Sequence, residues 1–206
     1  MIIVHHLENS RSQRVLWLLE ELGLPYEVKR YERNPKTKLA PPSLKKVHPL
    51  GKSPVIEDDG MVIAETGAIV EYLVNKADGI LGAPTDRTAA LRYTHFLHYA
   101  EGSLMPVVLM YMIVRMLKFL GWPARKPIRK MVMLHLDWLE TEMATRPWFA
   151  GDSFTAADVI MSFPVEAARQ QPGLDHHPHL VAWLDTIHAR PAYQRALTTG
   201  GPYSFT

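Results

Sequence analysis

Cysteine is absent from this chain of 206 residues. Without a thiol of its own, the protein forms no disulfide and cannot carry out thiol–disulfide exchange through a side chain. Any thiol chemistry in which it takes part must therefore use a thiol that a ligand brings. The composition excludes a reductase that works through an enzyme cysteine, and it leaves open the reduction of disulfides by a thiol ligand.

Long apolar runs and strong charge are absent as well. No run reaches the roughly 18 apolar residues of a transmembrane helix. The beginning, MIIVHHLENS, lacks the basic region and the cleavage pattern of a signal peptide. We therefore expect a cytoplasmic protein with no membrane partner. The formal net charge of +2 is too small to indicate a nucleic-acid partner.

Strand and helix signals alternate in the first part of the chain. Between Ser12 and Gly23 the apolar residues recur at the helical spacing i, i+3, i+4, i+7, and Gly23 ends the pattern. A strand on each side gives a strand–helix–strand unit, whose strands we expect to be parallel. The predicted order is β-α-β-α-β-β-α: strand Met1–His6, the helix, strand Leu24–Tyr31, a short helix Ser43–His48, two further strands, and a helix Thr66–Asn75.

The two further strands lie in the segment that ends at Thr66. The turn Asp58–Gly60 between two short apolar runs predicts an antiparallel hairpin. Pro54 enters the first strand and is a candidate for a cis peptide bond, which would turn the backbone N–H and C=O of Ser53 outward, toward an extended peptide. Thr66 can cap the next helix, whose N-terminus attracts a carboxylate. Together these features predict a pocket for a small zwitterionic peptide.

The second part of the chain shows helical patterns only. GILGAP breaks the earlier pattern, and we expect residues 79–86 to be a linker. Beyond it, Pro106 predicts a break in an apolar helical stretch. Pro127 is expected at the start of a helix that runs to Ala144.

Two groups of polar residues in this part could be read as functional sites, but we expect neither to be one. Thr155 and Asp158 have the spacing of a helix capping box, so we interpret both as structural residues rather than catalytic ones. The histidines of the tract 176–179 suggest a metal site, but the proline within the tract restricts its geometry and no cysteine accompanies it. We therefore expect no metal.

Four elements in order resemble the glutathione S-transferase family: Ser10 in a loop before the first helix, K-S-P-V at Lys52–Val55, E-T at Glu65–Thr66 and F-T-A-A-D-V at Phe154–Val159. The resemblance covers nearly the whole chain and points to the bacterial and fungal branch with a seryl-type active site. It implies an α/β thioredoxin-like domain at residues 1–78 that binds glutathione. An all-α helical-bundle domain at residues 87–206 would follow the linker.

The resemblance also implies the catalytic group. In this family a hydroxyl beside the first helix donates to the sulfur of glutathione, which favours the thiolate. Ser10 is the first candidate for this role. Alignment on the segment that begins at Gly23 places Asn9 there if no gap is allowed, and Ser12 is a third candidate, so all three stay open. Arg11 is close enough to strengthen the binding of an anion.

The rest of the glutathione site follows from the same resemblance. The backbone of Ser53 would pair with the cysteinyl part, and Glu65 with Thr66 would bind the γ-glutamyl end. Lys52, which belongs to the motif, and Lys38, which rests on its place in a loop, are candidates for the glycyl carboxylate.

The second substrate of such an enzyme is apolar and electrophilic. Methionine suits a promiscuous binding wall, and the candidates are Met105, Tyr111, Met112 and Met116. The same stripe is also ordinary for a helical core. The leading hypothesis is a glutathione transferase that conjugates glutathione to hydrophobic electrophiles in detoxification, or uses it to reduce organic hydroperoxides. The alternative is a glutathione-binding or carrier protein without turnover. The resemblance further implies a homodimer.

Overall fold

The computed structural model describes residues 1–205, which form two compact units. The first unit comprises Met1–Gly82 and His188–Ser204, and the second comprises Ala83–Ile187 and Phe205. The predicted order of elements, a mixed α/β part followed by helices, is confirmed. The domain ranges 1–78 and 87–206 remain a proposal, to which the structure adds that residues 188–204 group with the first unit.

A four-stranded sheet in the order β2-β1-β3-β4 is the centre of the first unit. Strand β1 (Ile2–Leu7) is parallel to β2 (Tyr26–Tyr31), as predicted. Strands β3 (Val55–Asp58) and β4 (Met61–Ala64) form the predicted antiparallel hairpin. The φ angles at its turn are 48° at residue 59 and 79° at residue 60, the left-handed pair that a tight hairpin turn requires.

Three helices follow strands of this sheet: α1 (Ser12–Leu22) after β1, α2 (Leu44–Val47) after β2 and α3 (Thr66–Lys76) after β4. Gly23 has a φ of 64° and provides the left-handed C-cap that ends α1. The core of the unit consists of apolar side chains of the sheet, α1 and α3, among them Ile2, Val4, Val15, Leu19, Ile56, Ile69 and Leu73.

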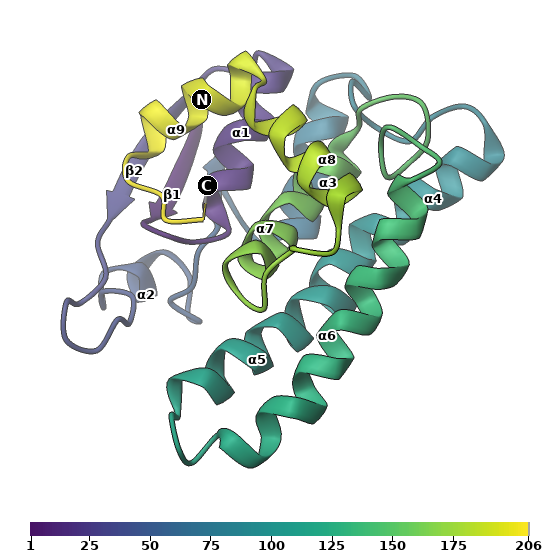
Figure 1. The fold of residues 1–206 in the computed structure, drawn as a ribbon. Helices are drawn as coiled ribbons and strands as arrows, with labels where there is room; N and C mark the ends of the chain where they lie inside the picture. Colours follow the sequence, from purple (N-terminus) through teal and green to yellow (C-terminus); the bar gives the residue numbers. More distant parts are fainter. Residues whose placement is uncertain (206) are drawn as a thin grey trace. The chain divides into compact units, whose positions relative to one another are not determined.

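The C-terminal helix α9 (Pro191–Gly200) also belongs to this unit and packs against α1 (Figure 1). The rings of Trp17 and Tyr193 meet edge to face, with their centroids 5.1 Å apart. The Arg190 guanidinium donates two hydrogen bonds to Glu21, at 2.6 and 2.8 Å. These contacts build the end of the chain into the first unit.

The second unit consists of helical segments. They are α4 (Arg87–Tyr99), a π-helical turn η1 (Ala100–Leu104), α5 (Met105–Met116), α6 (Trp122–Met143), α7 (Ala156–Gln170) and α8 (Pro178–His188). Helix α7 is buried over most of its length and packs against α4. Helices α5 and α6 pack against each other as a long hairpin (Figure 1).

Prolines mark where these helices change. Pro106 is the second residue of α5, which begins directly after η1, so the predicted break takes the form of a wider turn, which accommodates the missing N–H. The prediction that Pro127 starts a helix is wrong, because α6 begins at Trp122 and contains Pro127. Pro123 stands in the first turn instead, where a backbone N–H would have no acceptor within the helix, so proline loses no hydrogen bond there.

Helix α7 begins with both hydrogen bonds of the predicted capping box. The Thr155 side chain accepts from the backbone N–H of Asp158, and one carboxylate oxygen of Asp158 accepts the Thr155 N–H at 3.0 Å. The other oxygen accepts the N–H of Phe149 at 3.0 Å and the indole N–H of Trp183 at 3.4 Å. The buried carboxylate therefore joins three segments of the second unit.

Candidate active site

Three segments meet at one end of the sheet in the first unit. His5 lies opposite Val55, and Val55 lies opposite Ala64. The loop after β1, the peptide Ser53–Pro54 before β3, and Glu65 after β4 therefore share this end. Since neighbouring strands are about 4.8 Å apart, the loop after β1 and Glu65 are separated by two spacings, about 10 Å.

A chain of hydrogen-bonding side chains lies in the first of these segments. Ser10 Oγ is 2.8 Å from Ser12 Oγ, which is 2.9 Å from His6 Nδ1. The N–H of Ser12 donates to Ser10 Oγ at 3.2 Å, and the N–H of Leu7 donates to Ser12 Oγ at 3.3 Å. Ser12 is completely buried, whereas Ser10 is 6% exposed. Ser10 is therefore the serine nearer to solvent.

The protonation state of the His6 imidazole determines which hydroxyl donates and which accepts in this series of hydrogen bonds. Burial, and to a lesser degree the charge of Arg30, lowers the pKa of His6 from 6.5 to about 4, so the ring is neutral at neutral pH. His6 also bonds the backbone of Gly200. A carbonyl only accepts, so the ring nitrogen toward Gly200 carries the proton and Nδ1 is an acceptor for the Ser12 hydroxyl. The proton of Ser10 is then free to point either to Ser12 or to a ligand.

The two neighbours of Ser10 in the loop have different surroundings. Asn9 has a φ of 49°, in the left-handed region, and its Oδ1 accepts the N–H of Ser204 at 2.7 Å. Its side chain is thus engaged with the C-terminal segment. Arg11 is the N-cap residue of α1 and makes no side-chain capping bond within residues 1–205.

The Ser53–Pro54 peptide bond is cis, as predicted. The Ser53 hydroxyl turns inward, where it donates to the C=O of His5 at 2.8 Å and accepts the N–H of Leu7 at 3.3 Å. In the part of the chain that the structure describes, the backbone N–H and C=O of Ser53 have no partner. Both groups are therefore available to an added extended chain.

Glu65, rather than Thr66, is the N-cap residue of α3. The predicted cap by Thr66 is wrong, because Thr66 is already helical and is buried. Glu65 is exposed and has a φ of 70° with a ψ of 123°, a positive-φ conformation that costs a residue with a side chain about 1–3 kcal/mol. Its own side chain does not cap the helix within residues 1–205. The first N–H groups of α3 are left for water or a ligand.

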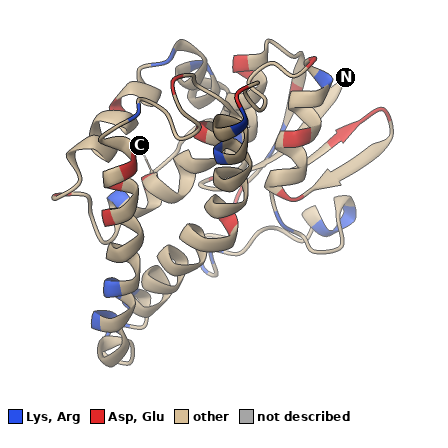
Figure 2. Cartoon of the chain, turned by 90° about the vertical axis from the view of Figure 1, so that its right-hand side faces the viewer, with Lys and Arg blue, Asp and Glu red and all other residues tan. Residues whose placement is uncertain are grey.

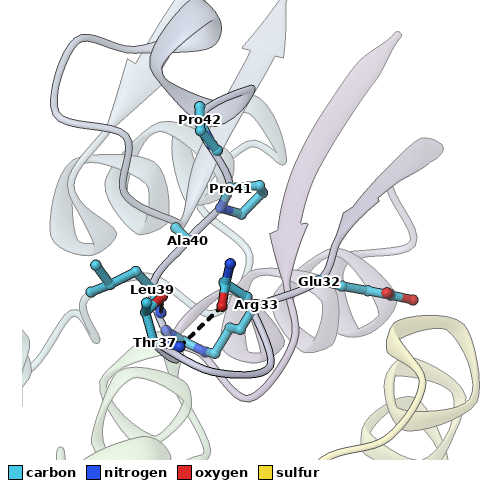
Figure 3. A pocket seen from close by; sticks show the side chains of 8 residues that line it. Glu32, Arg33, Thr37, Leu39, Ala40, Pro41 and Pro42 are labelled. Atoms are coloured by element: carbon cyan, nitrogen blue, oxygen red, sulfur yellow. Dashed lines mark hydrogen bonds between the residues drawn. The ribbon is translucent and has the colours of Figure 1, made fainter.

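The loop between β2 and α2 borders a pocket of about 440 Å³ (Figure 3). Its lining residues are Glu32, Arg33, Asn34, Thr37, Leu39, Ala40, Pro41 and Pro42. Lys38 belongs to the same loop, and its C=O accepts a hydrogen bond from Arg33 at 3.1 Å. Lys52 is exposed and precedes Ser53 directly. Lys52 therefore lies next to the shared end of the sheet, whereas Lys38 lies in the loop that borders the pocket.

The four apolar candidates all lie on α5 in the second unit. Met105 and Tyr111 are buried in its core, Met112 is half-buried, and Met116 is exposed at the end of the helix. Within residues 1–205, no group of three or more His, Asp or Glu side chains is placed to hold a metal ion.

Two residues of this region, His6 and Arg33, make contacts that the sequence does not predict. His6 alternates with His5 in a strand, and nothing in that pattern indicates its bond to Ser12. Arg33 donates to the C=O groups of Glu8 and Asn9, so it joins the loop after β2 to the loop after β1. In the sequence Arg33 stands among other basic residues, such as Arg30 and Lys36, and such a cluster is typical of a solvated surface.

The fold defines a thioredoxin-like domain followed by a helical domain, and one end of the sheet carries Ser10, Ser53 and Glu65. Residues 1–75 match the family model "Glutathione S-transferase, N-terminal domain", and residues 124–191 match "Glutathione S-transferase, C-terminal domain". The chain is 38% identical to glutathione S-transferase 3 of Schizosaccharomyces pombe, over 93% of this chain and 85% of that protein.

Solved structures agree with this match. A glutathione S-transferase from Actinobacillus pleuropneumoniae superposes with a TM-score of 0.90 at 33% identity, over 100% of this chain and 95% of that chain. A glutathione transferase family member from Pseudomonas fluorescens, solved with two glutathione bound, has a TM-score of 0.79 at 25% identity, over 95% and 92% of the two chains. The chain belongs to the glutathione S-transferase family, and it is a glutathione transferase enzyme.

Proposed function

We propose that this enzyme activates the thiol of glutathione through Ser10 and joins it to apolar electrophiles. The observation that carries the proposal is the meeting of Ser10, the Ser53 backbone and Glu65 at one end of the sheet. The two strand spacings of about 10 Å equal the reach of three extended residues, at about 3.3–3.6 Å each. A tripeptide therefore fits between the Ser10 loop and α3. The Pseudomonas relative with bound glutathione supports this choice of ligand.

In the proposed binding mode the free backbone groups of Ser53 bind the cysteinyl residue of glutathione, as an added strand would. Glu65 binds the amine of the γ-glutamyl residue, and Thr66 with the first N–H groups of α3 binds its carboxylate. Lys52 binds the glycyl carboxylate, with Lys38 on the pocket loop as the second candidate.

The proposed chemistry begins with the thiol proton, which leaves to solvent. A free cysteine thiol has a pKa of about 8.5, and a hydroxyl that donates to the sulfur lowers this pKa because it stabilises the charged form. Without a ligand, the Ser12 hydroxyl donates to His6 and accepts a hydrogen bond from the Ser10 hydroxyl. When the thiolate binds, the Ser10 hydroxyl donates to the sulfur instead. The thiolate then attacks an electrophilic carbon, and the C–S bond forms as the leaving group departs with its electron pair.

The remaining parts of the proposal rest on the family. Met112 and Met116 would contact the apolar substrate, with Met105 and Tyr111 as the packed residues behind them. The same thiolate would serve as the nucleophile toward an organic hydroperoxide. We also propose that the enzyme is a cytoplasmic homodimer.

The test is the ultraviolet absorbance of the thiolate of bound glutathione as a function of pH, in the wild type and in Ser10→Ala. The bound thiol should titrate about one pH unit or more below the free thiol, and the variant should lose about 1–2 units of that depression, the size of one hydrogen bond to a charged group. Glutathione should still bind. Ser43→Ala, at an exposed serine of the same unit, is the control. If the thiol bound to the wild type titrates as it does in water, the proposal that this site activates the thiol through Ser10 fails.

A further inference from the structure

The end of the hairpin formed by α5 and α6 exposes large apolar side chains. We define this hairpin end as residues 113–131. Met116, Phe119, Leu120 and Trp122 are between 71% and 79% exposed, and Ile113, Leu117 and Met131 are exposed as well. Large apolar side chains that gather at one hairpin end and are exposed to this degree mark a site for a partner or a membrane.

The turn of the hairpin is well formed, so this exposure does not come from a frayed loop. The backbone N–H groups of Leu120 and Trp122 donate within the turn, and Arg125 donates to the C=O of Lys118 at 2.7 Å. Gly121 is buried, and a Cβ there would lie 1.9 Å from the C=O oxygen of Val114, so this approach requires glycine. Backbone hydrogen bonds thus hold the turn, while its large apolar side chains are exposed.

Positive charge surrounds these apolar side chains. Residues 102–136 contain no Asp or Glu, and their basic residues are Arg115, Lys118, Arg125, Lys126, Arg129 and Lys130. Figure 2 shows blue segments toward the end of this hairpin and no red there. The whole chain has a net charge of only +2, so the remainder of the chain is net negative. The positive charge is thus concentrated where the apolar surface is.

We propose that the hairpin end docks on an anionic phospholipid surface. Phe119, Leu120 and Trp122 would enter the headgroup layer, and the basic side chains would contact lipid phosphates. Aromatic and leucine side chains flanked by Lys and Arg have the composition of interfacial membrane anchors, and each basic side chain adds attraction to an anionic leaflet. A second copy of the hairpin end would match the apolar surface but would bring like charges together. An anionic lipid surface matches both.

Docking at the surface differs from spanning the membrane. The stretch Arg87–Met116 is long and apolar enough to cross a membrane by length and composition, but core helices pass the same test, and 44% of its apolar window is buried within the structure. The proposed docking uses the exposed turn and leaves that core in place. The proposal of peripheral binding thus departs from the expectation of no membrane partner.

The experiment is cosedimentation of the full chain with vesicles of phosphatidylcholine alone or mixed with phosphatidylserine, at low and high salt. We expect at least about tenfold tighter binding to the anionic vesicles, and weaker binding at high salt. Vesicles with brominated lipid tails should quench tryptophan fluorescence, and Trp122→Phe should remove most of this quenching. No binding, or equal binding to both vesicle types, would overturn the proposal.

Two double variants separate the apolar and electrostatic contributions. Phe119→Ser with Leu120→Ser, and Lys126→Glu with Lys130→Glu, should each weaken anionic-vesicle binding at least about tenfold. The controls are Leu91→Ser, at a side chain 71% exposed on α4, and Lys45→Glu with Lys46→Glu, all of which should bind as the wild type does. Circular dichroism and glutathione turnover confirm that each variant is folded. If the hairpin variants change the oligomeric mass and leave vesicle binding unchanged, this surface is an interface between copies, and the proposal fails.

Discussion

Two helix starts, one in each unit, use polar residues in opposite ways. At α7 in the second unit, Thr155 and Asp158 cap the helix, and the carboxylate is enclosed by donors from three segments. At α3 in the first unit, Glu65 stands at the N-cap position with a positive φ, and among the described residues its side chain makes no capping hydrogen bond. One start is closed by the protein itself, and the other is left open.

The difference separates a folding role from a binding role. An enclosed carboxylate whose lone pairs are all used has nothing left to offer a ligand, whereas an open helix N-terminus beside unpaired backbone groups is a ready anion site. Glu65 keeps a strained backbone conformation although its side chain does not cap the helix within the described residues. Such strain is a reason to look for a function.

Asp158→Ala should give the largest loss of stability. It removes the cap of α7 and leaves the buried N–H donors of Phe149, Thr155 and Trp183 without an acceptor. We expect the free energy of unfolding to fall by about 3 kcal/mol, measured by denaturant titration. Glutathione affinity, measured where the variant is still folded, should not change. Asp152→Ala, at an exposed site nearby, is the control. Loss of binding at unchanged stability would give Asp158 a role in the site.

Acid should act on the two units in opposite directions. The folded-state pKa of His6, about 4, lies below its ordinary value of 6.5, so the unfolded chain binds the proton first and stability falls as pH drops from about 6.5 to 4. Burial raises the pKa of Asp158 to about 6 from 3.8, so this group instead gains stability as pH falls through that range.

His6→Asn isolates the first of these effects. Asparagine keeps a polar side chain beside Ser12 but does not titrate. The wild type should lose about 3 kcal/mol relative to the variant between pH 7 and pH 4, at about 1.4 kcal/mol per pH unit. Denaturant titrations of both proteins across this range measure the difference. A constant difference between the two proteins would show that His6 is not held neutral by burial.

Glu65→Ala should weaken glutathione binding by about tenfold or more, because it removes the proposed partner of the γ-glutamyl amine, a charged interaction of about 1.5 kcal/mol. Calorimetry with glutathione measures it. Glu71→Ala, at an exposed position of α3, should bind as the wild type does. Unchanged binding in Glu65→Ala would remove the open start of α3 from the proposed site.

Local signals were enough to predict most of the fold. The Asp59–Gly60 turn, the Gly23 stop and the Thr155–Asp158 spacing each act through backbone conformation or a bond a few residues away, so the sequence order carries the information. Helix starts were less certain. Pro123 and Pro127 both satisfy the preference for proline in a first turn, and only the packed structure decides between them.

The site was harder to predict because its geometry depends on distant segments. The sequence placed Ser10, Ser53 and Glu65 in loops, but the sheet register brings these loops together. The links from His6 to Gly200 and from Asn9 to Ser204 depend on how the C-terminal segment packs, and no spacing rule covers such pairs. Long-range polar contacts are therefore the part that sequence patterns do not encode.

Ser12→Ala should have the smallest effect on chemistry, although it alters the same hydrogen-bond chain as Ser10. The variant keeps the backbone N–H that donates to Ser10 Oγ, and it removes only the competing acceptor of the Ser10 proton. Turnover should stay within about threefold of the wild type, because that factor corresponds to less free energy than a typical neutral hydrogen bond contributes. Stability should fall by about 1–2 kcal/mol, because Nδ1 of His6 loses its donor. The matched control is Ser162→Ala, another buried helical serine, which should lower stability without touching the thiol titration. If Ser12→Ala instead abolishes the depressed titration of bound glutathione, Ser12 is the donor to the sulfur, and burial within a hydrogen-bonded cluster no longer separates a folding residue from a functional one.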